Sequence, residues 1–277
     1  MDNVFSGILK VYDDFRDDGQ AITINYDLKN PNEDIISKYK IDRIAGDGTD
    51  FERSIRLLNW LCDHVYHYGY YDNHVGRDGL KLLDYAFDKG ENRGINCRAL
   101  SIILTECLLS VGIKARTVSM VPLSPYDGDN HVICEFYDEV RSKWVMIDPT
   151  FNLYLTDKDN NPLSILEIRN ILADRKDVFL SKEANYNGKE VEVDEITTYY
   201  GKNMFSLEVY EHQGRCSEEL DNNRLINIVP KGFDVPKRKA ANIEYRVREF
   251  DNSSLKDKFM KIEAATKRVY RDMSVLY

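Results

Sequence analysis

Three residue types that together perform thiol chemistry occur in order along the chain, as Cys97, His131 and Asp148. Cys97 opens an apolar pattern that is typical of a helix as far as Val111, and Gly112 is a residue that ends helices. A thiol at a helix N-terminus faces unpaired amides and the positive end of the helix dipole, which favour the thiolate. The same amides can stabilise an oxyanion. The pattern therefore predicts that Cys97 is a nucleophile.

A base and a group that orients it are predicted downstream. Strand-like runs at 131–137 and 143–151 are separated by a short polar turn, which indicates an antiparallel hairpin. A turn centred near Glu139 and Val140 would place His131 directly opposite Asp148. A carboxylate in that position accepts the imidazole N–H, fixes its tautomer and stabilises the imidazolium. Taken singly, His131 is also compatible with a structural histidine and Asp148 with a turn former.

Four segments around these residues resemble the core of the transglutaminase-like superfamily. They are Gly94-Ile-Asn-Cys97-Arg98, Gly112-Ile-Lys-Ala-Arg116, His131-Val-Ile-Cys-Glu135 and Trp144-Val-Met-Ile-Asp148-Pro149-Thr150. The resemblance covers residues 55–155 and implies an α+β, papain-like fold whose nucleophile helix packs on an antiparallel sheet. It implies that Cys97, His131 and Asp148 form a catalytic triad acting on an amide or peptide through a thioester, without a cofactor. The segment Tyr200-Gly-Lys-Asn-Met-Phe205 also resembles bacterial members.

The resemblance further implies a second oxyanion donor on a side chain upstream of Cys97. Four residues are open for this role or for the adjoining pocket: Trp60, His67, Asn73 and Asn96. We favour His67, because His67-Tyr-Gly69 is expected to end a helix and to project from a loop, although a helix end packed on the core is the alternative. The aromatic stretch 64–71 is expected to line the acyl pocket.

Hydrolysis by a peptidase or amidase is the expected reaction, and several alternatives stay open. Amine transfer by a transglutaminase is one. Arylamine N-acetyltransferases share the Cys-His-Asp order, but Ile95 replaces the second glycine of their Arg-Gly-Gly-x-Cys motif. Peptide N-glycanases carry C-x-x-C zinc pairs that are missing here. A binding module that kept the fold without the activity is the non-enzymatic alternative.

No metal site is expected. The histidines of His64-x-x-His67 and His74 lack a carboxylate or thiol at a recognisable ligand spacing. The segment Asp157-Lys-Asp159-Asn-Asn161 starts like a calcium loop, but Pro162 occupies the glycine position and Ile168 the bidentate glutamate position. We interpret it as a surface turn.

Composition limits the protein class. The 277 residues are 43% hydrophobic and 31% charged, as in a globular protein, and the net charge of −9 disfavours a general nucleic-acid binder. The longest apolar run has four residues, so we expect no membrane span, and the absence of a leader pattern predicts a cytoplasmic protein. The five cysteines form no C-x-x-C pair, and free thiols are expected, with core positions for the four besides Cys97: Cys62, Cys107, Cys134 and Cys216.

We expect a single domain over 1–277, divided into an N-terminal part at 1–54, the core at 55–155 and a C-terminal part at 156–277. Capping boxes at Thr49 and Ser164 predict helix starts. Helices are further expected at 4–15 and 80–87, strands at 21–28, 115–122, 205–210, 224–229 and 243–248, and an amphipathic closing helix with Leu255, Phe259, Ile262, Val269 and Met273 on its apolar face.

Overall fold

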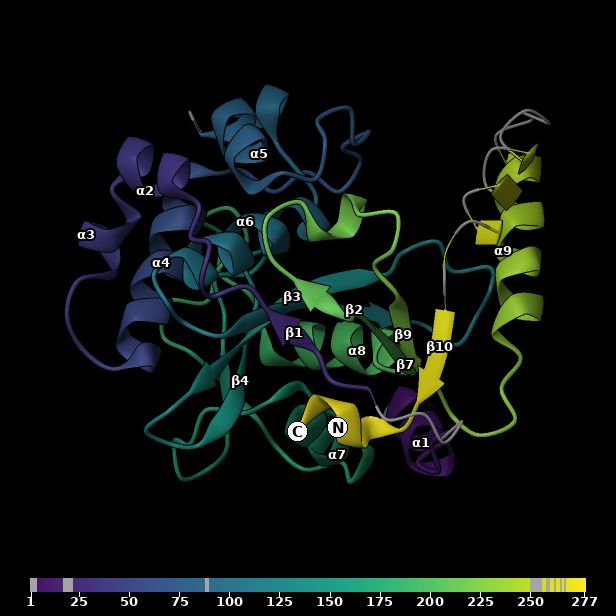
Figure 1. The fold of residues 1–277 in the computed structure, drawn as a ribbon. Coiled ribbons are helices and arrows are strands. Elements are labelled where there is room, and N and C mark those ends of the chain that lie inside the picture. Colours follow the sequence, from purple (N-terminus) through teal and green to yellow (C-terminus); the bar gives the residue numbers. More distant parts are fainter. Residues whose placement is uncertain are drawn as a thin grey trace.

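A six-stranded sheet in the order β10-β9-β7-β2-β3-β4 forms the centre of the structure (Figure 1). The structure is a computed structural model that describes residues 4–16, 22–87, 90–249, 256–257, 260–261, 263–264, 266 and 268–277. All neighbouring strands of this sheet are antiparallel except β10 and β9. Its strands are β2 Ala115–Val121, β3 His131–Asp138, β4 Lys143–Ile147, β7 Ser206–Tyr210, β9 Leu225–Ile228 and β10 Arg268–Arg271. Two-strand pairs outside it are β1 Asn25–Tyr26 with β8 His212–Gln213, and β5 Leu155–Thr156 with β6 Phe179–Leu180.

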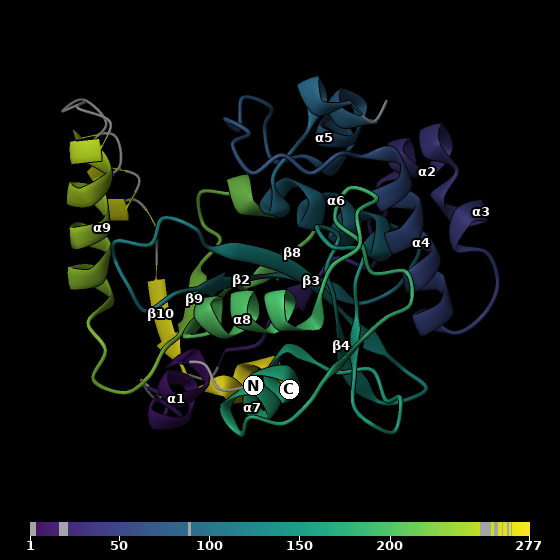
Figure 2. The ribbon, with the colours of Figure 1, turned by 180° about the vertical axis from the view of Figure 1, so that it is seen from behind.

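Helices cover both faces of the sheet (Figures 1 and 2). One hydrophobic cluster joins the sheet to α2 Glu33–Tyr39, α3 Ile41–Ala45, α4 Asp50–His64, α5 Gly79–Ala86 and α6 Cys97–Ser110. The other joins it to α1 Val4–Val11, α7 Ile165–Ala173 and α8 Val193–Asn203. The remaining elements are α9 Val235–Glu249, at the outer side of the molecule, and the short 3₁₀ turns Glu91–Arg93, Ser217–Glu219 and Met273–Leu276. The predicted α+β fold, with the Cys97 helix packed on the sheet, is confirmed.

The helix α6 begins and ends as the sequence predicts. Asn96 caps it, because its side chain accepts a hydrogen bond from the backbone of Ala99 at 3.1 Å. Every residue from Ala99 to Leu109 is buried, so the helix is enclosed by protein on all sides. Gly112 has a left-handed φ of 82°, which other residues adopt only with strain, and it terminates the helix. The capping boxes at Thr49 and Ser164 are also present.

The register of the β3–β4 hairpin differs from the prediction. Cys134 pairs with Ile147 and Asp138 with Lys143, so a continuation of this register would place Ile133, and not His131, opposite Asp148. His131 and Asp148 are therefore diagonal neighbours. They still share one face of the sheet, because the shift is two residues and side chains alternate with a period of two.

Several predicted elements were wrong. Residues 243–248 lie in α9 and not in a strand, because Asp234 accepts a hydrogen bond from the Lys237 backbone at 2.9 Å and starts a helix there. The helix α8 was not expected. Of the apolar face of the predicted closing helix, Leu255, Phe259 and Ile262 lie outside the described residues. Val269 lies in β10 and Met273 in a 3₁₀ turn.

A buried charged group connects the motif segments that resemble the superfamily. Arg116 and Glu135 are opposite each other on β2 and β3, and their side chains form an ion pair at 2.7 Å with 1% and 0% exposure. The guanidinium of Arg116 also lies 3.7 Å from the ring centre of Trp144. Besides its contact with Glu135, Nη2 of Arg116 donates to the carbonyl of Leu276 at 2.7 Å, which ties the C-terminal turn to the sheet. Within the part of the chain that the structure describes, no helix has the length and apolar character to cross a membrane.

Candidate active site

Cys97 lies at the first position of α6 and on the wall of a cleft of about 690 Å³. Its thiol is half-buried, and His67 and His131 also line the cleft. At this position the backbone amide of Cys97 is one of the helix N-terminal donors that have no partner within the helix. The helix thus places a thiol and an amide donor together, as the sequence predicts.

His131 and Asp148 form a fully buried pair. The Nε2–H of His131 donates to Oδ2 of Asp148 at 2.6 Å, and the two side chains are 1% and 0% exposed. Two further donors hold the carboxylate: the hydroxyl of Tyr200 at 2.6 Å to Oδ2 and the amide of Thr150 at 2.8 Å to Oδ1. Because Nε2 is occupied by Asp148, Nδ1 is the ring nitrogen of His131 that is left to interact with Cys97.

The surroundings favour an ion pair between the thiolate and the imidazolium. Burial alone would raise the pKa of Cys97, but hydrogen bonds and charges from His131 and His67 lower this pKa to about 6. Burial opposes the charged form of His131, yet the charge and hydrogen bond of Asp148 and the contact with Cys97 raise the pKa of His131 to about 10. The pKa of Asp148 is lowered despite its burial, because His131, Tyr200 and Thr150 stabilise the carboxylate. At pH values between the pKa of Cys97, about 6, and that of His131, about 10, Cys97 is charged and nucleophilic.

Aromatic rings enclose the imidazole of His131. The ring of Tyr199 meets it edge-on with centres 5.1 Å apart, and the ring of Phe151 lies at 5.8 Å. Both residues line the cleft. Such rings exclude water from one side of the imidazole and restrict its rotation.

His67 lies beside Cys97 because the two chain segments form a short parallel bridge. The backbone of Ile95 accepts from the amide of Tyr68 at 2.8 Å and donates to the carbonyl of Tyr66 at 3.0 Å. Gly94 makes this approach possible, since a Cβ there would lie 2.5 Å from the Cβ of Tyr68. The helix α4 ends at His64 and not at the predicted stop Gly69, so His67 lies on the following loop.

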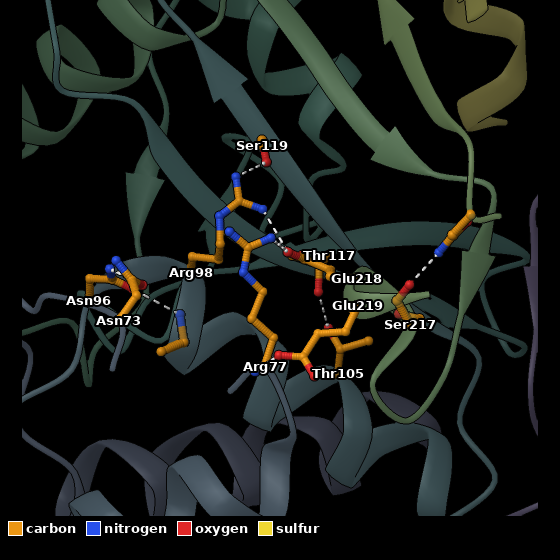
Figure 3. A network of polar contacts seen from close by, with 12 residues as sticks. Asn73, Arg77, Asn96, Arg98, Thr105, Thr117, Ser119, Ser217, Glu218 and Glu219 are labelled. Atoms are coloured by element: carbon orange, nitrogen blue, oxygen red, sulfur yellow. Dashed lines mark hydrogen bonds and ion pairs between the residues drawn. The ribbon is translucent and has the colours of Figure 1, made fainter. Parts of the chain in front are cut away.

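Polar contacts around the start of α6 hold the cleft wall (Figure 3). The amide of Asn96 donates to Oδ1 of Asn73 at 3.0 Å, and Asn73 has a left-handed φ of 58°. Arg98 donates to the carboxylate of Glu218 at 2.9 Å. Arg77 donates to the same carboxylate oxygen at 2.9 Å. Asn96 and Asn73 thus lie in the cleft wall, but their amide groups bond to each other and to backbone groups.

Trp60 does not belong to the cleft. Its ring packs against Tyr39, His64 and Phe87, and these contacts place it in the hydrophobic cluster that α4 shares with α2 and α5. Trp60 lies seven residues before His67, on a helix whose apolar side faces the core. The prediction that Trp60 is a pocket residue is therefore wrong. Of the aromatic stretch 64–71, the residues in the cleft are His67, Gly69 and Tyr71.

Three of the other four thiols have raised pKa values, which disfavour a thiolate. Cys107 and Cys134 are buried, and burial raises both pKa values, that of Cys134 to about 12. Cys216 is half-buried, and its pKa is raised to about 11 by burial and by its hydrogen bond to Asp78. Cys62 is half-buried as well, and its thiol contacts the carbonyl of Pro149 at 3.2 Å. The expectation of core positions thus holds fully for Cys107 and Cys134 alone.

No group of three or more histidine, cysteine or acidic side chains is arranged to hold a metal ion within the described part of the chain. In the segment that starts like a calcium loop, Asp157 accepts hydrogen bonds from the amides of Asp159 and Asn161 at 2.8 and 2.9 Å. This is a turn in which the aspartate caps the backbone.

Sequence reasoning missed the residues that reach the site from the C-terminal half. Tyr186 and Asn187 contact His67, and Tyr199 and Tyr200 contact His131 and Asp148. They follow the matched segments by many residues, and no local pattern connects them to the site. The resemblance of the segment that begins at Tyr200 was a signal that this part of the chain matters.

Residues 38–149 match the model of a family described as the transglutaminase-like superfamily, and Cys97, His131 and Asp148 lie within the matched range. Among solved structures, the chain is similar to a protein from Cytophaga hutchinsonii that its name assigns provisionally to the cysteine proteases. The two are 15% identical with a TM-score of 0.35, over 44% of this chain and 40% of that chain. A search of the curated proteins found no match. The family match supports a catalytic function based on a cysteine.

Proposed function

We propose that this chain, which belongs to the transglutaminase-like superfamily, hydrolyses an amide bond in a peptide or protein through a thioester on Cys97. The proposal is supported by the buried pair of His131 and Asp148, joined at 2.6 Å, in the cleft that Cys97 and His131 line, and by the lowered pKa of the Cys97 thiol. A thiol with a lowered pKa, a buried base and a carboxylate that orients the base are the three parts of a thiol-dependent acyl transfer site.

The reaction begins with attack of the Cys97 thiolate on the carbonyl carbon. A carbon–sulfur bond forms, and the electron pair of the C=O double bond moves to the oxygen. When the C=O bond re-forms, the carbon–nitrogen bond breaks, and the amine leaves with a proton from His131. Water then attacks the thioester and gives a proton to His131. The carbon–sulfur bond breaks, and the products are a carboxylic acid and the free enzyme.

Asp148 keeps His131 in the correct orientation and stabilises its positive charge. The carboxylate accepts the Nε2 proton, so that Nδ1 is the nitrogen that exchanges protons with Cys97, the leaving amine and water. Tyr200 and Thr150 in turn keep the carboxylate ionised within a buried environment.

Water is the expected acceptor of the acyl group. Exclusion of water and guidance of an amine require an organised acceptor site next to the thioester. The two tryptophans of the chain do not line the cleft: Trp144 stacks on Arg116, and Trp60 packs in the helical cluster. With no tryptophan wall in the described cleft, water at about 55 M competes well with an amine for the thioester.

Amine transfer and acetyl transfer are the alternatives. Both use the same thioester, so they differ from hydrolysis only in the acceptor or in the acyl donor. A coenzyme A competition assay distinguishes an acetyltransferase. A non-catalytic binding module would show no turnover and no enhanced labelling of Cys97.

A mixed peptide library tests the proposal. The protein is incubated with the library with and without a primary amine, and mass spectrometry reads cleavage, deamidation and amine incorporation. The proposal predicts cleavage or deamidation that disappears in Cys97→Ala. Dominant amine incorporation would favour the transglutaminase alternative, and no change in the library would contradict the proposal.

A further inference from the structure

We infer that Tyr186 is a positioning residue that keeps a proton on the His67 nitrogen facing Cys97, so that His67 donates a hydrogen bond to the oxyanion. This inference rests on the proposed function and concerns the second donor of the oxyanion site. It assigns a role to the turn at residues 185–188, which follows the matched family segment by more than thirty residues.

The backbone of His67 is held on both sides by a single side chain. Oδ1 of Asn187 accepts from the amide of His67 at 2.9 Å, and Nδ2 of Asn187 donates to the carbonyl of His67 at 3.0 Å. The bridge between Ile95 and the residues adjoining His67 fixes the same segment from the other side. These contacts set the position of His67 relative to the start of α6 before any substrate is present.

The turn that carries Asn187 is itself well defined. Oδ1 of Asn185 accepts from the amide of Gly188 at 2.7 Å, and the amide of Tyr186 donates to the carbonyl of Lys189 at 2.7 Å. Asn187 has a left-handed φ of 50°, a conformation that asparagine adopts more easily than most residues. The turn therefore presents Tyr186 and Asn187 to His67 as one rigid unit.

The ring of His67 has one nitrogen for each neighbour. Nδ1 lies 3.0 Å from the hydroxyl of Tyr186, so Nε2 is the ring nitrogen left for Cys97, which lines the same cleft as His67. Burial raises the pKa of Tyr186, and the phenol keeps its proton. A phenol that donates to Nδ1 makes that nitrogen an acceptor, and the neutral ring then carries its proton on Nε2.

This tautomer matters only when charge moves onto the carbonyl oxygen. In the resting site the Nε2–H faces the thiolate of Cys97. During attack the negative charge moves from the sulfur to the oxygen, where Nε2–H and the backbone amide of Cys97 form the two donors that an oxyanion requires. The opposite tautomer would present a lone pair to the oxyanion and repel it.

Two reagents separate this role from a general effect on the thiol. Acylation of Cys97 by p-nitrophenyl acetate passes through an oxyanion, whereas alkylation by iodoacetamide does not, and both need the thiolate. We measure both rates at pH 8 for the whole chain and for Tyr186→Phe, which keeps the ring and removes the donor. Tyr70→Phe, on the same loop as His67 and 88% exposed, is the matched control.

We expect the acylation rate of Tyr186→Phe to fall about tenfold, because one oxyanion donor contributes 10²- to 10³-fold and a wrong tautomer weakens that donor in part. The alkylation rate should stay within about twofold of the parent. In a His67→Gln background the amide donates without a tautomer, so adding Tyr186→Phe should change little. An unchanged ratio of the two rates, or equal falls in both, overturns the inference. If Cys97→Ala keeps the ester reactivity of the parent, the proposed function fails as well.

Discussion

At the residue scale, the five thiols differ in how their surroundings treat a negative charge. Cys97 lies at a helix start beside two histidines and has its pKa lowered to about 6. Cys134 and Cys216 have pKa values raised to about 12 and about 11, the first mainly by burial and the second by burial and a neighbouring carboxylate. The assignment of Cys97 as the nucleophile therefore depends on these pKa differences, and the alkylation rates of the five thiols test it.

Iodoacetamide should alkylate Cys97 before the other thiols, and the rate should follow the thiolate. We expect the rate to fall as the pH drops through about 6, where the thiol becomes protonated, and to reach a plateau above it. Peptide mapping of the folded protein at several pH values checks this. Faster labelling of Cys62, Cys107, Cys134 or Cys216 would show that the nucleophile is misassigned.

The rate of turnover should also fall at high pH, whereas the rate of alkylation should not. The leaving amine takes its proton from His131, whose pKa is raised to about 10 by Asp148 and Cys97 against the effect of burial. Hydrolysis should therefore decline below about pH 6, where Cys97 is protonated, and above about pH 10, where His131 has lost its proton. The pH profile of kcat/KM is the measurement. A profile with a single rising limb would argue against His131 as the acid.

Replacement of Asp148 by Asn should leave the fold intact and reduce turnover by orders of magnitude, because an amide neither stabilises the imidazolium nor enforces its tautomer. Circular dichroism and steady-state kinetics are compared with the control Asp63→Asn, an exposed aspartate on α4. Full activity of Asp148→Asn with an unchanged pH profile would mean that another group orients His131.

At the element scale, the buried pair between β2 and β3 supports the strand that carries His131. Arg116 is 1% exposed, and Glu135 is its charge partner at 2.7 Å. Glu135→Gln should lower the free energy of unfolding by about 3–5 kcal/mol, because it leaves the Arg116 charge buried without compensation. Urea unfolding measures this, with the exposed Glu139→Gln as the control. A loss below about 1 kcal/mol would show that Trp144 and the carbonyl of Leu276 are sufficient partners for Arg116.

The elements with strong local signals were predictable, and those set by tertiary contacts were not. Asn96, Gly112 and the capping boxes define helix ends through local hydrogen bonds and backbone conformation, and they occur as expected. The hairpin register depends on Ser142, which has a left-handed φ of 51°. This conformation keeps Ser142 out of the strand, so the pairing of β4 with β3 begins at Lys143. The helix α8 contains Gly201 and several β-branched residues, and it is stabilised by the packing of its apolar side and not by propensity.

The same division holds within the candidate site. Cys97, His131 and Asp148 are placed by one helix and one hairpin, so their types and order indicated a common site. The contact between His67 and Tyr186 joins residues 119 positions apart, and no hydrophobic periodicity or helix-capping residue predicts this contact.

At the scale of the whole molecule, the cleft determines which acceptor reaches the thioester. A primary amine at millimolar concentration should not displace water, because neither tryptophan lines the described cleft: Trp144 stacks on Arg116, and Trp60 lies in the helical cluster. A glutamine peptide is incubated with the protein and the amine, and mass spectrometry compares the amount of free acid with the amount of amine adduct. Efficient incorporation of the amine with little free acid would contradict this expectation.

Activity should not depend on calcium. The aspartate-rich segment at 157–161 is followed by Pro162, where a calcium loop needs glycine, and Ile168 replaces the bidentate glutamate. A chelator should therefore change neither the rate nor the melting temperature. A calcium-dependent rate, or a rise in Tm of several degrees on calcium addition, would show that a site exists.

If Cys97 carries the acyl group, a brief reaction with an activated ester should leave that group on its sulfur. The protein is mixed briefly with p-nitrophenyl acetate, quenched in acid and mapped by mass spectrometry. We predict one acetyl group on Cys97, removed by hydroxylamine as a thioester is, and none at that position in Cys97→Ala. Acetylation at another residue with Cys97 unmodified, or ester turnover by Cys97→Ala at the rate of the parent, would show that Cys97 does not carry the acyl group.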